Sequence, residues 1–318
     1  MAWRRPFDPR KPHVHLANIC SGNELRELEP WRPYPKVDPT TLFASKSLNL
    51  TSFSLYEIGK DICLVLLSGS PDDSPLPGHT ILEPSERLSR AQNIEHALIQ
   101  WYENLPQTSR TEDSKDSYIA GPVLDVHLTY NVWRITLYGV LIQCKTDSPQ
   151  PDREEYNQKT ISACASIAGL VQAGQRSWGL SNGPFSMVHG ASVGTHALLG
   201  FLDRPDVPQI VHTMIVALTA SCHRWTLARG IVRTLWLTLR EREIESLLPD
   251  STLDLLRSSA VEKWGPEDHR LFASCAYPNY AASDNSRYPV GIGEVLESYA
   301  QLDLGQMDQP ESSSRGPG

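Results

Sequence analysis

The stretch GPVLDVHLTYNVWRITLYGVLIQCK, residues 121–145, predicts the central helix of this protein. Apolar residues occupy one broad stripe of the expected helix and most of its other sides as well. A helix with this pattern is normally enclosed by other helices. The stripe consists of Leu124, His127, Leu128, Asn131, Ile135, Tyr138 and Ile142. We therefore predict a helix from Pro122 to Lys145 at the centre of an all-α bundle.

An amphipathic helix is expected just before this central helix. Its apolar residues recur at spacings of three and four until Pro106 ends the pattern. They are Leu88, Ala91, Ile94, Leu98, Trp101 and Leu105. The Trp101 ring should be buried against the part of the central helix between Leu124 and Tyr138. Glu95 is placed on the opposite, polar face, where its replacement should cost little stability.

Capping, first-turn and breaking residues predict the remaining helices. Thr51-Ser52 caps the first, and Asp152 with Glu155 forms a capping box for another. The expected helices cover residues 53–67, 152–171, 208–239 and 251–263, and one more restarts at Pro266. Gly174 should weaken the second of these helices, and Gly230 should divide the third.

The chain is expected to have three parts. Residues 1–48 are proline-rich and irregular, residues 49–300 form a helical domain, and residues 301–318 form a disordered tail. The chain of 318 residues is 40% hydrophobic and 21% charged, which is enough to bury a substantial core. No apolar run approaches the roughly 20 residues of a membrane span, and no signal peptide is visible.

Charge and cysteine spacing argue against two kinds of binding. The formal net charge of −8 opposes direct binding of nucleic acid, whose affinity depends on basic residues. The six cysteines are Cys20, Cys63, Cys144, Cys164, Cys222 and Cys275. They are too widely spaced for zinc pairs, which use close spacings such as C-x-x-C. We expect free thiols, no metal and no cofactor in this chain.

Two segments together resemble a known family. The sequence WYENLP at residues 101–106 is followed, fifteen residues later, by GPVLDVHLTYN at residues 121–131. This order is similar to the regulatory, or middle homology, domain of fungal binuclear zinc-cluster transcription factors, where a helix ending W…LP precedes one of the type LH..Y. Shorter similarities lie at Trp3–Pro6, at the tryptophan-containing loop Glu27–Tyr34, at Cys164–Ala168, and at Trp225 with Ala228.

The resemblance implies an irregular multi-helix bundle that regulates transcription of RNA polymerase II genes in the nucleus and is not an enzyme. In the family, a zinc cluster, a linker and a coiled coil precede this domain. We therefore expect the chain to be truncated at its N-terminal side, without its own DNA-binding module. Implied partners are the transcription machinery or co-regulators, a small-molecule effector between helices, and a second copy through the absent coiled coil. Exposed apolar surface should follow from the missing part.

An enzyme alternative rests on Gly190-Ala191-Ser192-Val193-Gly194, which has the G-x-S-x-G pattern of an α/β-hydrolase-like serine hydrolase. Residues 185–188 would form the preceding strand, and Asp250 and His269 would complete the triad. The helical pattern of residues 49–170 argues against the required sheet. The glycines then serve close helix packing or a turn.

Three other features have plain structural interpretations. His13-Val14-His15 lacks a third metal ligand. His127 is either a hydrogen-bonded core histidine or a pocket residue. Trp101, Trp133, Trp225 and Trp236 are expected to be core or groove aromatics. No catalytic, cofactor-binding or metal-binding residue is assigned.

Overall fold

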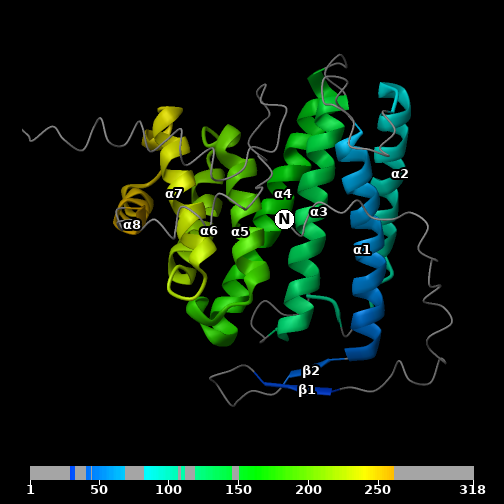
Figure 1. Cartoon of the computed structure of the whole chain (residues 1–318), viewed down its shortest axis with the longest axis horizontal. Coiled ribbons are helices and arrows are strands. Elements are labelled where there is room, and N and C mark those ends of the chain that lie inside the picture. Colours follow the sequence, from blue (N-terminus) through cyan, green and yellow to red (C-terminus); the bar gives the residue numbers. More distant parts are fainter. Residues whose placement is uncertain are drawn as a thin grey trace, which may run out of the picture.

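The computed structural model describes residues 29–32, 41–43, 45–68, 82–106, 109–111, 119–144 and 150–260. Within these ranges the protein is almost entirely helical, and the predicted all-α class is confirmed. Most of the helices stand side by side in one row, from α2 and α1 at one end to α7 and α8 at the other (Figure 1). The N-terminal segments 1–28, the expected helix after Pro266 and the expected tail at 301–318 lie outside the described residues.

The helices have the following bounds: α1 Ser45–Leu67, α2 Pro84–Glu103, α3 Gly121–Cys144, α4 Gln150–Trp178, α5 Phe185–Leu198, α6 Val207–Ser221, α7 Thr226–Glu241 and α8 Asp250–Ala260. In the part of the chain that the structure describes, short 3₁₀ turns lie at Leu180–Asn182, Leu199–Phe201 and Glu245–Leu247. Two three-residue strands, β1 Glu29–Trp31 and β2 Thr41–Phe43, pair antiparallel.

Helix α3 lies at the centre of the fold, as predicted. It packs against α1, α2, α4 and α5, and 14 of its 24 residues are buried. Its bounds agree with the predicted helix 122–145 to within one residue. The apolar character on nearly all sides of this helix is therefore explained by neighbours on those sides.

The start of α1 differs from the prediction. The helix begins at Ser45, six residues before the expected cap Thr51. The hydroxyls of Thr51 and Ser52 donate to the carbonyls of Ser47 and Leu48 at 2.8 Å, one turn earlier. They therefore satisfy carbonyls inside a helix instead of capping amides at its start. The segment 1–48, expected to be irregular, also contains β1 and β2, and β1 replaces the predicted loop around Trp31.

Two glycines do not have the predicted effect. Gly174 lies within α4, which continues to Trp178, and a Cβ at this position would come within 2.9 Å of the Met187 sulfur. Gly230 is buried inside α7, while the break in the 208–239 stretch falls at residues 222–225. A helical glycine costs only about 1 kcal/mol. Close packing against Met187 outweighs that cost at Gly174, and Gly230 stays helical inside the buried face of α7.

Glycine is required where α1 crosses α3. A Cβ at Gly59 would lie 2.4 Å from Cε2 of Trp133, closer than real carbon atoms approach. The indole of Trp133 therefore rests directly on the backbone of α1. Contact of this kind lets α1 approach the central helix without a gap.

Trp101 joins three helices, and its predicted burial is confirmed. Its side chain is 8% exposed, and its ring stacks on Tyr130 of α3 with centroids 5.4 Å apart. The indole N–H donates to the Thr51 carbonyl and to the Ser54 hydroxyl of α1, each at 3.0 Å. One side chain of α2 therefore contacts both α1 and α3 and satisfies its own polar atom while buried.

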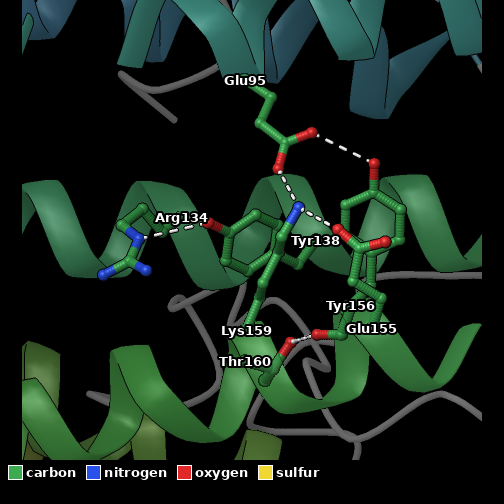
Figure 2. Close-up of polar contacts among 7 residues, drawn as sticks. All are labelled: Glu95, Arg134, Tyr138, Glu155, Tyr156, Lys159 and Thr160. Carbon is green, nitrogen blue, oxygen red and sulfur yellow. Dashed lines mark hydrogen bonds and ion pairs between the residues drawn. The ribbon is translucent and has the colours of Figure 1, made fainter. Parts of the chain in front are cut away.

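The prediction for Glu95 was wrong. Its side chain is only 13% exposed, and its carboxylate forms an ion pair with Lys159 of α4 at 2.9 Å. It also accepts a hydrogen bond from the Tyr156 hydroxyl at 3.1 Å. Figure 2 shows Lys159 reaching between Glu95 and Glu155, with Tyr138 of α3 beside them. Helical periodicity placed Glu95 away from α3, but α4 lies on that side and supplies a partner.

Trp101→Ala should cost about 3–5 kcal/mol of unfolding free energy, because a buried aromatic ring and its contacts are lost. Gln92→Ala, on the exposed face of the same helix, should cost less than about 0.5 kcal/mol. Urea unfolding followed by circular dichroism measures both values. Equal midpoints for the two variants would show that Trp101 does not hold α1, α2 and α3 together.

A candidate ligand-binding groove

An open groove of about 680 Å³ lies where the end of α2 meets α3 and α4. The sequence contained only two indications of it, namely the suggestion that His127 is a pocket residue and the small-molecule effector between helices that the family resemblance implies. The groove draws residues from three helices and from the connection between α2 and α3. The volume falls within the range of about 300–1,000 Å³ typical of sites for small molecules.

The first wall of the groove is aromatic. Tyr102 of α2 stacks on Tyr130 of α3 with centroids 4.8 Å apart and planes inclined by 19°. The His127 ring meets Tyr102 edge-on at 5.9 Å. The WYENLP and LH..Y sequence blocks, which are separate in the chain, therefore pack directly against each other here.

His127 is both a core histidine and a groove residue. It is 2% exposed, and its Nε2 lies 2.7 Å from the carbonyl oxygen of Ser109. Since a carbonyl can only accept, Nε2 carries the proton and donates it. Asn131, one turn later, donates from its Nδ2 to the His127 carbonyl at 2.8 Å. These hydrogen bonds fix the orientation of the His127 ring in the groove. They also connect α3 to the segment between α2 and α3 through the Ser109 carbonyl.

Arg134 supplies positive charge to the groove. Its Nε donates to the Tyr138 hydroxyl at 3.2 Å, and its Nη1 donates to Oδ1 of Asn131 at 3.0 Å. The guanidinium carbon lies 5.4 Å from the Tyr130 ring centroid and 5.7 Å from that of Tyr138. Within the described ranges, Arg134 forms no ion pair. Neutral and aromatic partners therefore fix the orientation of this cation without cancelling its charge.

Burial raises the pKa of Tyr130 to about 12, although the charge of Arg134 opposes that effect. The phenol is therefore neutral at physiological pH. Its hydroxyl can donate a hydrogen bond, and its ring presents an uncharged surface to the groove.

Helix α4 forms the opposite wall, with a mixture of small, apolar and polar residues. Leu170 and Ala173 are buried at its base, while Ser166, Gln172 and Arg176 are exposed. Gly169 faces open space, since a Cβ added there would meet no atom within 4 Å. The missing side chain at Gly169 is therefore one reason that the groove is open.

The G-x-S-x-G segment is not a nucleophile elbow. Residues 185–188, the expected strand, form the first turn of α5, and Ser192 lies inside that helix with 0% exposure. The strand–turn–helix geometry that the serine hydrolase alternative requires is therefore not formed at Ser192. Asp250 begins α8, and His269 lies outside the described residues.

The glycines of this segment serve close packing, as the structural interpretation predicted. A Cβ at Gly190 would lie 3.2 Å from Cδ2 of Leu128 in α3, and one at Gly194 would lie 2.7 Å from the sulfur of Met214 in α6. The two glycines therefore let α5 fit between α3 and α6.

The remaining candidate residues give no site. In the described part of the chain, no three His, Cys, Asp or Glu side chains are grouped as metal ligands. Cys63, Cys144 and Cys164 are free thiols, and the Cys222 thiol donates to the Leu218 carbonyl. His13, His15, Cys20 and Cys275 lie outside the described residues. Among the helices that the structure describes, none combines the length and apolarity needed to cross a membrane.

Apolar surface is exposed on α1. The side chains of Phe53, Tyr56 and Leu64 are 55%, 56% and 46% exposed. Helical spacing of three and eight residues places them on one side of this helix, away from its buried residues Leu55 and Ile62.

Comparison of the chain with protein-family models, with curated proteins and with solved structures found no match. The resemblance to the regulatory domain of zinc-cluster factors therefore stays a prediction from the sequence.

A buried histidine in α5 should make the protein sensitive to acid. His196 is 6% exposed, and its Nδ1 lies 2.8 Å from the Ser192 carbonyl. Burial, reinforced by the charge of Arg242, lowers the pKa of His196 to about 4. The same group in the unfolded chain titrates near its ordinary value of about 6.5.

Below pH 6.5 the unfolded chain therefore binds a proton that the folded protein excludes, and stability falls as the pH approaches 4. The loss from His196 should reach about 2 kcal/mol at pH 5. Urea unfolding at pH 7 and pH 5 measures this loss, and His196→Gln should reduce it by about that amount. His96→Gln, on the exposed face of α2, is the matched control. An unchanged acid sensitivity in His196→Gln would contradict the assignment.

Ser192→Ala should leave any background esterase activity of the purified chain unchanged, since a fully buried serine in a helix cannot reach a substrate. Hydrolysis of p-nitrophenyl acetate by both proteins tests this. Loss of a robust activity on substitution would instead identify Ser192 as a nucleophile.

Proposed function

We propose that this chain is a non-enzymatic regulatory module of a fungal zinc-cluster-type transcription factor, acting on RNA polymerase II genes in the nucleus. In this proposal DNA is read by a separate module. The chain acts through co-regulators or components of the transcription machinery, under the control of a small molecule bound between its helices. The fungal regulatory-domain type of fold belongs to the same proposal.

One observation carries the proposal. The two sequence blocks that bear the resemblance, WYENLP and LH..Y, are brought together by the fold and form the aromatic wall of the groove. Sequence blocks that serve packing alone need not lie beside a groove and could occupy any part of the core. Here Tyr102 of the first block, with His127 and Tyr130 of the second, also lines a groove that a ligand can reach, so the LH..Y motif contributes directly to the candidate site.

The position of the groove suits regulation. Its walls come from α2, α3 and α4, and a ligand that contacts all three changes the relative free energy of their arrangements. Such coupling is typically about 1–3 kcal/mol, or about 5–150-fold in an equilibrium constant. A partner surface formed by the same helices would then respond to occupancy of the groove.

A fusion of the chain to an unrelated DNA-binding module tests the function. Placed upstream of a reporter with moderate basal expression, the fusion should raise or lower reporter output relative to the DNA-binding module alone. Trp101→Ala, which removes the contact among α1, α2 and α3, should abolish the change, while Gln92→Ala should preserve it. Immunoblots check that the variants are present at equal levels. Output equal to that of the DNA-binding module alone would contradict a regulatory role.

A further inference from the structure

Arg134 has unused hydrogen-bonding capacity that faces the groove. A guanidinium carries five N–H donors, and the contacts to Tyr138 and Asn131 use two of them. Three N–H groups remain for solvent or a ligand. Glu103, at the end of α2, is exposed, raises the pKa of Tyr130 through its charge, and forms no ion pair with Arg134.

The contacts of Arg134 also hold the guanidinium still. Tyr138 and Asn131 fix two edges of the planar group, and the Tyr130 ring lies against it. An anion that binds such a group meets donors already in place and loses little affinity to ordering the side chain. Planar arginine forks match carboxylate oxygens well because two parallel N–H bonds can form.

The rest of the groove is built for a flat apolar body. Tyr102, whose ring stacks on the buried Tyr130, lies on one side of the groove, and Leu170 and Ala173 form an apolar surface on α4. The space above Gly169 is unfilled. A ligand with an aromatic or cyclic body could therefore lie between α4 and the tyrosines, with its charged end on Arg134.

We propose that this groove binds a small organic carboxylate with a flat apolar body, held by its carboxylate on the Arg134 guanidinium and by its body against Tyr102, Tyr130 and Leu170. The inference rests on the proposed function, because it specifies the effector that the regulatory module binds. A phosphate monoester presents a similar anionic end, and the experiment below separates the two.

The binding test uses phenylacetate, indole-3-acetate and 1-naphthylacetate, each paired with its neutral primary amide, together with 1-naphthyl phosphate. Isothermal titration calorimetry of the full chain measures each affinity. At least one carboxylate should bind at least about tenfold more tightly than its amide, since a charge-assisted hydrogen bond contributes that much. Tighter binding of the phosphate than of every carboxylate would overturn the choice of carboxylate. Equal affinity of each acid and its amide would overturn the role of Arg134.

Arg134→Gln should remove the preference for the carboxylate while leaving amide affinity within about threefold, because only the charge interaction is lost. Arg134→Lys should restore part of the preference, since it keeps the charge but not the planar fork. Thermal melts establish that both variants are folded. A folded Arg134→Gln protein that keeps the full preference would show that the anion binds elsewhere.

A second pair of variants tests the location independently of charge. Gly169→Leu should fill the groove and weaken binding of acid and amide alike by at least about tenfold. Gly139→Leu is the matched control, because Gly139 lies in α3 outside the groove and also has no atom within 4 Å of an added Cβ. Unchanged binding by a folded Gly169→Leu protein would overturn the site. If Gly169→Leu fails to fold, Gly169→Ser with the Arg134 pair decides the location.

The ligand and the proposed function fail in different ways. A fusion that changes reporter output, together with no carboxylate preference in the purified chain, would overturn the ligand and leave the regulatory role standing. Carboxylate binding that depends on Arg134 and Gly169, together with a fusion that leaves reporter output unchanged, would overturn the regulatory role and leave the ligand standing.

Discussion

Burial of α3 on nearly all sides is the constraint on which the rest of the structure depends. A helix with apolar residues around most of its circumference is stable only if several helices cover it. Neighbouring helices can approach α3 closely only where a side chain is absent. Gly59 of α1 and Gly190 of α5 provide such positions, since an added Cβ would meet Trp133 and Leu128 of α3. Burial of α3 also requires partners for the polar groups that are carried inside, as the contact of His127 with Ser109 shows. The packing of α1, α2, α4 and α5 follows from this one requirement.

The groove lies where this cover is incomplete. Helices α2 and α3 run antiparallel, since Arg87 contacts Gln143 near one end and Trp101 stacks on Tyr130 near the other. Helix α2 ends at Glu103, and beyond this end α3 is contacted by Ser109, whose carbonyl accepts a hydrogen bond from His127. Polar residues of α3, among them Asn131 and Arg134, line the groove beside this end. The same helix is thus a core element along most of its length and one wall of the proposed binding groove beside the end of α2.

The two outer walls of the groove are tied together some distance from it. Glu95 of α2 pairs with Lys159 of α4, seven residues before Tyr102 on one helix and seven before Ser166 on the other, which is about two turns in each case. Hydrogen bonds to Glu155 and Glu95 raise the pKa of Lys159 in spite of its partial burial, so the lysine stays charged. A change in the spacing of α2 and α4 at the groove would therefore alter the distance between Lys159 and Glu95, and in the proposed function this ion pair couples occupancy of the groove to the arrangement of the helices.

The sequence by itself determined the class of fold, the central place of α3 and the burial of Trp101, because helical periodicity is a local property that survives in any arrangement of neighbours. Tertiary structure decided where α1 begins, since the hydroxyls of Thr51 and Ser52 bond backwards inside the helix. It kept Gly174 helical, since close packing against Met187 outweighs a cost of about 1 kcal/mol. It also placed Glu95 in an ion pair with Lys159 of α4, whereas helical periodicity had assigned Glu95 to the solvent-exposed face of α2. The groove could not be predicted, because Tyr102, Arg134 and Gly169 come from three helices and no spacing in the sequence reports that they meet; only the packing of α2 and α4 around α3 brings them together.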